Sequence, residues 1–193
     1  MGSGRLEAFS DGVIAIIITI MVLEMKVPHG ATLADLAPLL PVLLSYLLSF
    51  IYVAIYWNNH HHTLHATDII DARVMWANMH LLFWLSLFPF VTGWMGENHF
   101  KPVPTALYGF VLMMAAFAFA FALLQRAIVA RNGADSKLGI VLRRDFAGIA
   151  SPILYLIAIP MAFYNQWISD ALYVFVATLW IIPDKRIERN MNP

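Results

Sequence analysis

The chain alternates between long apolar stretches and short polar linkers. A helix needs roughly 20 mostly apolar residues to cross the hydrocarbon core of a bilayer, which is about 30 Å thick. Six stretches approach that length, and we predict helices over residues 6–25, 36–57, 74–94, 105–130, 146–163 and 167–182. Most linkers between them are rich in Gly, Pro, His or charge. The pattern predicts an all-α integral membrane protein with six transmembrane helices in a single domain, residues 1–193, and no soluble domain.

Composition supports this class. Of the 193 residues, 61% are hydrophobic and only 12% are charged, and the mean hydropathy is +0.71. A typical soluble domain is closer to half apolar and a quarter charged. This hydrophobicity makes the lipid bilayer the expected partner. The formal net charge is zero, so we expect no nucleic acid as a partner. The absence of cysteine excludes disulfides, thiolate metal sites and cysteine nucleophiles.

The distribution of Lys and Arg predicts the orientation. Six helices place the N-terminus, the second and fourth linkers and the C-terminus on one side. Only Lys26 and Lys101 fall on the other side. The positive-inside rule therefore predicts a multi-pass protein of the cell (inner) membrane with both termini in the cytoplasm. The ten basic residues on the cytoplasmic side are Arg5, Arg73, Arg126, Arg131, Lys137, Arg143, Arg144, Lys185, Arg186 and Arg189.

The first helix begins with polar residues that lipid disfavours. An ionised Asp within a span costs about 2.5–3.5 kcal/mol, so Asp11 should face protein and find hydrogen-bond donors. The third helix starts from the same side of the membrane, which puts its first polar residues at the depth of Asp11. Arg5, Asn78 and His80 are the donors at that level. We therefore predict a buried polar cluster that joins the first and third helices, formed by Arg5, Ser10, Asp11, Trp76, Asn78 and His80.

The same segment carries a motif, R-x-x-x-F-S-D-G, formed by Arg5, Phe9, Ser10, Asp11 and Gly12. It resembles the signature of the prokaryotic TMEM175 family of potassium channels. The similarity continues in "WNNHH" at the end of the second helix and from Asn78 through "LFPF" in the third. The resemblance implies a homotetramer, in which four chains surround one pore lined by the first helix. It also implies that the polar signature residues hold this helix to its neighbours.

The resemblance places the pore constriction five residues after the signature Asp, at Ile16. Thr19 and Leu23 follow at i+3 and i+7 and lie on the same stripe of the helix, whereas Asp11 lies about 140° away. No TVGYG or other glycine-rich filter occurs. We therefore expect a hydrophobic constriction that gates by dewetting and favours K⁺ because it sheds water more readily than Na⁺. Thr19 hydroxyls would compensate in part, and K⁺ as the permeant ion is the only ligand expected, with no cofactor.

Simpler interpretations of these residues stay open. Ile16 and Leu23 fit ordinary helix packing, and the Thr19 hydroxyl fits a bond to its own helix backbone. His61 and His65 have the i, i+4 spacing of a zinc-binding pair. The run "NHHHTLH" contains no carboxylate, however. We therefore predict a solvated or interfacial loop that titrates near neutral pH, and no metal site.

Two other classes of function compete with a channel. A proton-coupled secondary transporter, or a proton-permeable channel, would use Asp11 and His80 as a relay, but inverted repeats and a pair of broken helices are missing. An intramembrane hydrolase would need Ser10, Asp11 and His80 together. No G-x-S-x-G motif is present, and adjacent residues on a helix point about 100° apart. We therefore expect no enzyme.

Overall fold

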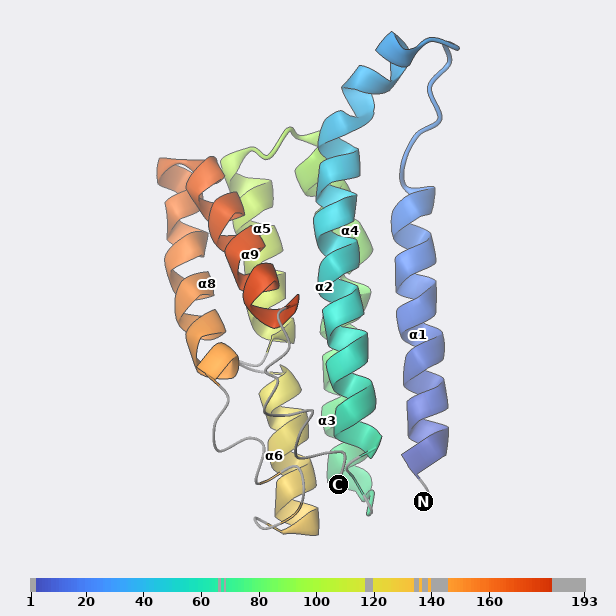
Figure 1. Ribbon diagram of the computed structural model, residues 1–193, viewed down its shortest axis with the longest axis vertical. Helices are drawn as coiled ribbons and strands as arrows, with labels where there is room; N and C mark the ends of the chain where they lie inside the picture. The colour runs from blue at the N-terminus through green and yellow to red at the C-terminus, as the bar shows by residue number, and fades with distance from the viewer. Residues whose placement is uncertain are drawn as a thin grey trace.

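The computed structural model describes residues 3–65, 67, 69–116, 120–133, 136, 139 and 146–181. Every regular element in these residues is a helix, which confirms the predicted all-α class (Figure 1). Within these residues the chain makes six helical passes, some of them divided into two helices. The elements are α1 (Ser3–Leu23), η1 (Leu33–Leu39), α2 (Leu40–His65), α3 (Ala72–Ser86), α4 (Phe88–Glu97), α5 (Pro102–Ala115), α6 (Ala120–Asn132), α8 (Phe146–Tyr164) and α9 (Gln166–Ile181).

Four of the passes are long and apolar enough to cross a membrane. They extend over Gly4–Leu23, Leu33–His65, Ala72–Glu97 and Pro102–Asn132. The last two passes, α8 and α9, are shorter apolar helices that pack against each other. Part of the orientation argument rests on residues outside the described ranges. These are Lys137, Arg143, Arg144, Lys185, Arg186 and Arg189.

The second helix is longer than predicted. We expected it to end at Trp57 and to be followed by a loop, but α2 continues to His65. The prediction was wrong because polarity was taken as the sign of a loop. Residues 58–65 contain neither Gly nor Pro, so nothing in them breaks the helix. This correction places all four histidines of the run on helix α2.

Two predicted helices are interrupted. The stretch 74–94 forms α3 and α4, which meet at Leu87. Pro89 has no N–H to donate to the carbonyl of Leu85, so the helical bonding pattern is lost there. The stretch 105–130 is divided as well, because α5 ends at Ala115 and Ala116 has an extended backbone with ψ 173°. Residues 117–119 lie outside the described ranges.

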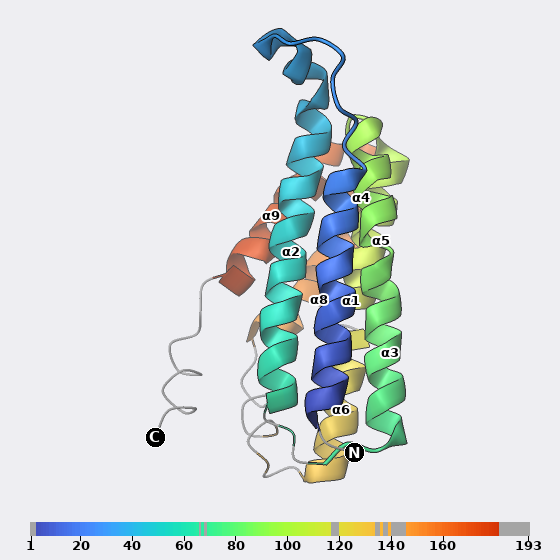
Figure 2. The same cartoon turned by 90° about the vertical axis from the view of Figure 1, so that its right-hand side faces the viewer.

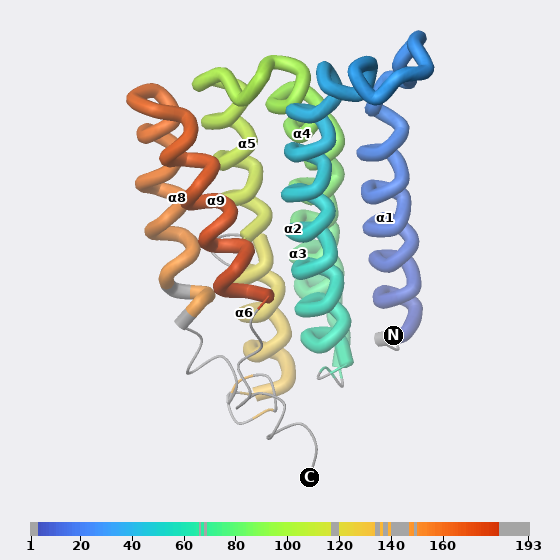
Figure 3. The backbone as a smooth tube through the Cα atoms, turned by 45° about the horizontal axis from the view of Figure 1, so that its top comes forward, coloured from blue at the N-terminus to red at the C-terminus, as the bar shows by residue number. Residues whose placement is uncertain are grey.

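Helix α1 lies at one edge of the bundle and α8 at the other (Figure 3). Helix α1 packs against α2, α3 and α4. Helices α5, α8 and α9 pack together, and α2 also contacts α9. The residues of α1 that face the bundle recur every three or four positions, as one face of a helix requires. They are Leu6, Ser10, Ile14, Ile17 and Met21.

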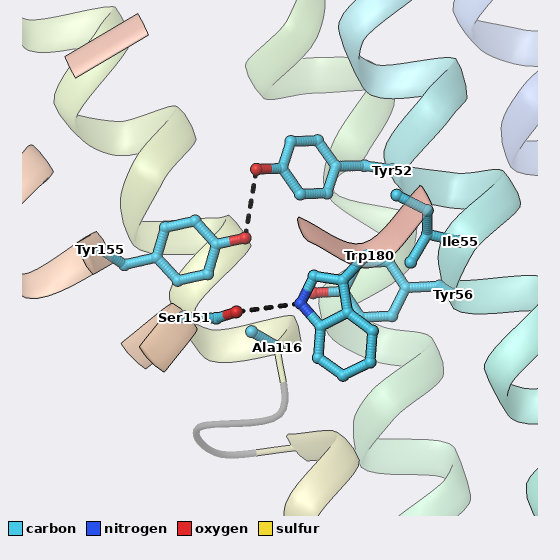
Figure 4. A pocket seen from close by; sticks show the side chains of 7 residues that line it. All are labelled: Tyr52, Ile55, Tyr56, Ala116, Ser151, Tyr155 and Trp180. Carbon is cyan, nitrogen blue, oxygen red and sulfur yellow. Dashed lines mark hydrogen bonds between the residues drawn. The ribbon is translucent and has the colours of Figure 1, made fainter. Parts of the chain in front are cut away.

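Buried tyrosines fill the space between α2, α5, α8 and α9. We call Tyr52, Tyr108, Tyr155 and Tyr173 the tyrosine cluster; each is at most 2% exposed. The Tyr155 hydroxyl donates to that of Tyr52 at 3.2 Å, and Tyr52 donates to the carbonyl of Tyr173 at 2.6 Å. Figure 4 shows the first of these bonds beside that from Trp180 Nε1 to Ser151 Oγ, at 2.9 Å. The cavity among these side chains is about 10 Å³, no more than one water molecule needs.

Contacts between loops show which ends of the passes lie together. Lys26, after α1, pairs with Glu97 at the end of α4 at 2.8 Å. At the opposite end, Asn132 at the end of α6 accepts from the Ile69 amide at 3.0 Å and donates to its carbonyl at 3.2 Å. The passes therefore alternate in direction.

Candidate functional site: the outer face of helix α1 and its polar anchor

Helix α1 lies on the outside of the bundle (Figure 2), and its face away from the other helices is apolar and exposed. We call Ile16, Thr19 and Leu23 the outer stripe. Ile16 is 58% exposed and Leu23 79% exposed, and Thr19 is exposed between them. Phe9 and Gly12 of the sequence motif are exposed too and extend the stripe towards the N-terminus. The three predicted pore residues therefore share a face that no other part of this chain covers in the described structure.

The Thr19 hydroxyl makes a bond within its own helix. It donates to the carbonyl of Ile16 at 2.8 Å, which is the backbone bond that sequence alone left open as the simpler interpretation. Its only proton is committed to this bond, so the oxygen keeps its lone pairs for another partner. The outer stripe thus presents hydrogen-bond acceptors, rather than donors, at its middle layer.

The opposite face of α1 is held by a chain of hydrogen bonds. Asn78 of α3 donates from Nδ2 to Ser10 Oγ at 2.9 Å, and its Oδ1 lies 2.7 Å from His60 Nε2 on α2. Ser10 in turn donates to the carbonyl of Leu6 at 2.8 Å. We call Ser10, Asn78 and His60 the polar network; all three are 0% exposed. It ties three helices together at one depth.

The donors in this network can be assigned from its chemistry. Because Asn78 uses its amide nitrogen on Ser10, its oxygen must accept the proton of His60 Nε2. The second ring nitrogen, His60 Nδ1, is buried and has no hydrogen-bond partner among the described residues. Buried polar groups usually have partners. In His60, only Nε2 has one among the described residues, and Nδ1 does not.

Asp11 has a different partner from the ones predicted. We named Arg5, Asn78 and His80 as its donors, but the donor in the structure is Trp57 Nε1 of α2, at 3.0 Å from Oδ1. Arg5 is exposed, and no ion pair joins it to Asp11 in the described part of the chain. The two lie six residues apart, which turns them about 120° away from each other on the helix.

The other two predicted members of the cluster lie elsewhere. His80 accepts a bond from Trp84 of its own helix, with Nε1 and Nε2 3.1 Å apart. Trp76 is 76% exposed on α3. Within one chain, the structure therefore brings together Ser10 and Asn78 from the predicted cluster, and leaves Arg5 and Trp76 at the surface.

Sequence reasoning missed Trp57 and His60. Both belong to "WNNHH", which we interpreted as the end of the second helix. His60 also lies in the run for which we predicted a solvated or interfacial loop, and that prediction was wrong for His60, which is 0% exposed. The signal that would have found them is helical spacing: with α2 continued to His65, Trp57 and His60 lie three residues apart on one face. That face is the one that meets α1 and α3.

The structure gives no support to a catalytic set. Ser10 is bonded to Asn78, Asp11 to Trp57 and His80 to Trp84. A nucleophile and its base must lie within hydrogen-bond reach of each other, with a third group orienting the base. These three side chains are instead bonded to three different partners.

Comparisons with known proteins agree over most of the chain. The family model described as "Endosomal/lysosomal potassium channel TMEM175" matches residues 5–89, which include the outer stripe and the polar network. A potassium channel of Chryseobacterium sp. (strain P1-3) is 49% identical over 192 residues, covering 100% of this chain and 99% of that protein. A potassium channel of Chamaesiphon minutus is 30% identical over 180 residues, covering 86% of this chain and 87% of its own.

A solved structure is similar as well. The crystal structure of a lysosomal potassium-selective channel TMEM175 homolog from Chamaesiphon minutus superposes with a TM-score of 0.79 at 28% identity. The match covers 93% of this chain and 96% of that one. The likeness therefore extends over all six passes and is not confined to the motif in α1.

Proposed function

Because this chain belongs to the TMEM175 family, we propose that it is a multi-pass membrane channel that conducts K⁺ passively. In this proposal residues 1–193 form one transmembrane domain, and four copies surround a common pore. The outer stripe of α1 faces the pore axis, with Ile16 at the constriction and Thr19 and Leu23 as the next layers. The activity is conduction and no chemical reaction.

The exposure of the outer stripe carries this proposal. The inner face of α1 packs against α2, α3 and α4, yet Ile16 and Leu23 remain 58% and 79% exposed. Lipid would suit Ile16 and Leu23, but it would offer no donor or cation to the lone pairs that the Thr19 oxygen leaves unused. A shared pore suits all three.

The same residues support selectivity by partial dehydration. The amino-acid sequence contains no TVGYG segment, and the Ile16 carbonyl on the outer stripe already accepts the Thr19 hydroxyl, so we propose selectivity without a carbonyl cage. A ring of four Ile16 side chains would make an ion shed part of its hydration shell, which costs K⁺ less than Na⁺. The Thr19 oxygens, which accept no hydrogen bond from the described residues, would replace some of the lost water.

The orientation follows from charge. We place the N-terminus of α1 and the C-terminal end of α2 in the cytoplasm of a cell with the chain in its inner membrane. The excess of Lys and Arg on that side supports this choice. Lys26 and Lys101 would then lie outside.

The test is an electrical recording on purified protein in liposomes, with K⁺ on one side and Na⁺ on the other. We expect a current that reverses towards the potassium potential. Absence of current combined with saturable uptake driven by a proton gradient would instead favour a transporter that uses Asp11 and His80.

The assembly has its own test, because the chain lacks cysteine. In Leu23→Cys, oxidation should link chains to one another in the membrane, since the stripes of neighbouring copies approach at the axis. Val22→Cys is the matched control, exposed on the same helix but about 120° away from Ile16. Equal cross-linking of both variants, or none in either, would contradict a pore lined by the outer stripe.

A further inference from the structure

Three side chains that do not belong to the pore stripe or the polar network meet where α1 begins and α2 ends. Glu7 Oε1 lies 2.8 Å from His61 Nδ1 and 3.6 Å from His65 Nε2. The three ligand atoms all lie within 4.8 Å of one another. The Glu7 side chain is 17% exposed and that of His65 is 65% exposed, so the group is anchored on one side and open to solvent on the other.

The folding of α2 creates this arrangement. His61 and His65 are one helical turn apart, and their ring centroids lie 4.5 Å from each other. The spacing i, i+4 directs two imidazoles from one helix to the same point. The sequence contained no carboxylate within the histidine run, which is why we predicted no metal there. Helix α1 supplies that carboxylate from more than 50 positions away.

We propose that Glu7, His61 and His65 form a binding site for a divalent transition-metal ion of the Zn²⁺ class. Two imidazoles and one carboxylate, with a water in the fourth position, are an established ligand set for zinc. Bond lengths of about 2.0–2.2 Å in a tetrahedron place ligand atoms about 3.3–3.6 Å apart. Of the two distances from Glu7 Oε1, 3.6 Å falls within that range and 2.8 Å is shorter.

A metal also accounts for the position of Glu7 better than a single hydrogen bond does. One carboxylate oxygen faces two ring nitrogens at once. A lone hydrogen bond would need only His61, whereas a cation bridges all three groups.

Binding would cross-link α1 to α2. Glu7 lies three residues before Ser10 and four before Asp11, so the ion would add a third tie to those made by Asn78 and Trp57. Trp57 also stacks on His61, with ring centroids 5.9 Å apart and planes 23° apart. The inference does not depend on conduction, and it can be tested without recording any current.

The experiment is isothermal titration of Zn²⁺ into purified full-length protein whose affinity tag has been removed. We expect saturable binding of one ion per chain. Glu7→Gln and His65→Ala should each weaken it by at least about tenfold, the size of effect seen when a metal site loses an interaction. His62→Ala is the matched control, since His62 is exposed in the same run but lies about 100° from His61 on the helix.

X-ray absorption on the wild-type protein with Zn²⁺ provides a second readout that needs no variant to fold. We expect a first shell of nitrogen and oxygen at about 2.0–2.1 Å with the outer-shell pattern of two imidazoles. Absence of stoichiometric binding would overturn the proposal. An equal loss of affinity in His62→Ala, or a shell without imidazole, would overturn it too.

Discussion

The two faces of the bundle differ in how completely one chain covers them. In the tyrosine cluster, each hydroxyl finds a partner inside the chain: Tyr108 contacts Ser49 Oγ at 3.0 Å, and Tyr173 donates to the Thr105 carbonyl at 3.2 Å. On the outer stripe, Ile16 and Leu23 contact little of the chain they belong to. The comparison teaches that the polar groups between α2, α5, α8 and α9 are paired within the chain, whereas the outer face of α1 presents apolar side chains that the described residues leave uncovered.

The largest effect on conduction should come from a substitution in the outer stripe. Ile16→Asn puts a polar group at the proposed constriction, which removes the dewetted layer and lets hydrated ions pass. We expect a higher conductance and a reversal potential near zero under bi-ionic K⁺ and Na⁺, with the thermal stability unchanged. Val22→Asn, exposed on the same helix but off the stripe, should keep the wild-type reversal potential. A selective current through Ile16→Asn would remove Ile16 from the pore.

The polar network joins the two regions, and breaking it should affect both. Asn78→Leu leaves the buried Nε2–H of His60 unpaired and removes a bond from Ser10, at a cost of roughly 2–4 kcal/mol in the free energy of unfolding. Thermal unfolding in detergent measures this loss.

The matched control for this change is Asn59→Leu. Among the described residues, Asn59 bonds only to the carbonyl of Ile55 in its own helix, at 2.8 Å, so its replacement should cost much less. If the two variants are equally stable, the network does not hold α1 in place.

A substitution beside the tyrosine cluster should lower the stability and leave the ion preference unchanged, which is the opposite of the result expected for Ile16→Asn. A Cβ on Gly109 would collide with the Tyr173 side chain, and overpacking of this kind costs about 1–3 kcal/mol. We therefore expect Gly109→Ala to lower the melting temperature and to leave the K⁺/Na⁺ preference intact. Gly93→Ala, with nothing within 4 Å of the new Cβ, should be neutral or slightly stabilising.

The smallest effect should come from the loop tie between Lys26 and Glu97. The hydrogen bond that Lys26 donates to Glu97, followed by the charge of that carboxylate, raises the pKa of Lys26 above 10.5. A raised pKa in the folded state contributes stability that is complete below the unfolded value and is lost as the pH rises through the folded one.

The measurement is the difference in melting temperature between wild type and Lys26→Met from pH 8 upwards. We expect a small difference at pH 8 that vanishes in strongly alkaline buffer. A difference in melting temperature that grows with pH would contradict the expected direction of this pH dependence. Because the pair is exposed to solvent, salt should reduce the effect as well.

Much of this architecture could be predicted from periodicity alone. Apolar length indicated the class and the six passes, and helical spacing was enough to place Ile16, Thr19 and Leu23 on one face. The position of Ser10 beside Asn78 also followed from equal depth in the membrane. These successes share a cause, since each depends on distance along a helix, which the sequence specifies directly.

The predictions that failed concern which side chains of neighbouring helices contact each other. Depth alone suggested Arg5 and His80 as partners for Asp11, but depth does not include the rotation of each helix, and Trp57 was the group that pointed there. The carboxylate beside His61 was invisible for the same reason, because Glu7 reaches it from another helix. Polarity also concealed the end of α2, since a histidine run without Gly or Pro continues a helix.

The bond between Ser10 and Asn78 has a consequence for how α1 is able to move. A turn of α1 about its own axis by one residue, about 100°, would carry Ser10 away from Asn78 and bring Phe9 or Asp11 to that position. A phenyl ring at that point would leave the Asn78 amide without an acceptor, and Asp11 could reach it only by giving up its bond to Trp57 Nε1. The polar network therefore fixes the rotation of α1 about its own axis. It thereby determines which residues, two turns further along the helix, point away from the bundle. A movement of α1 that keeps this bond should therefore tilt or bend the helix rather than rotate it about its axis.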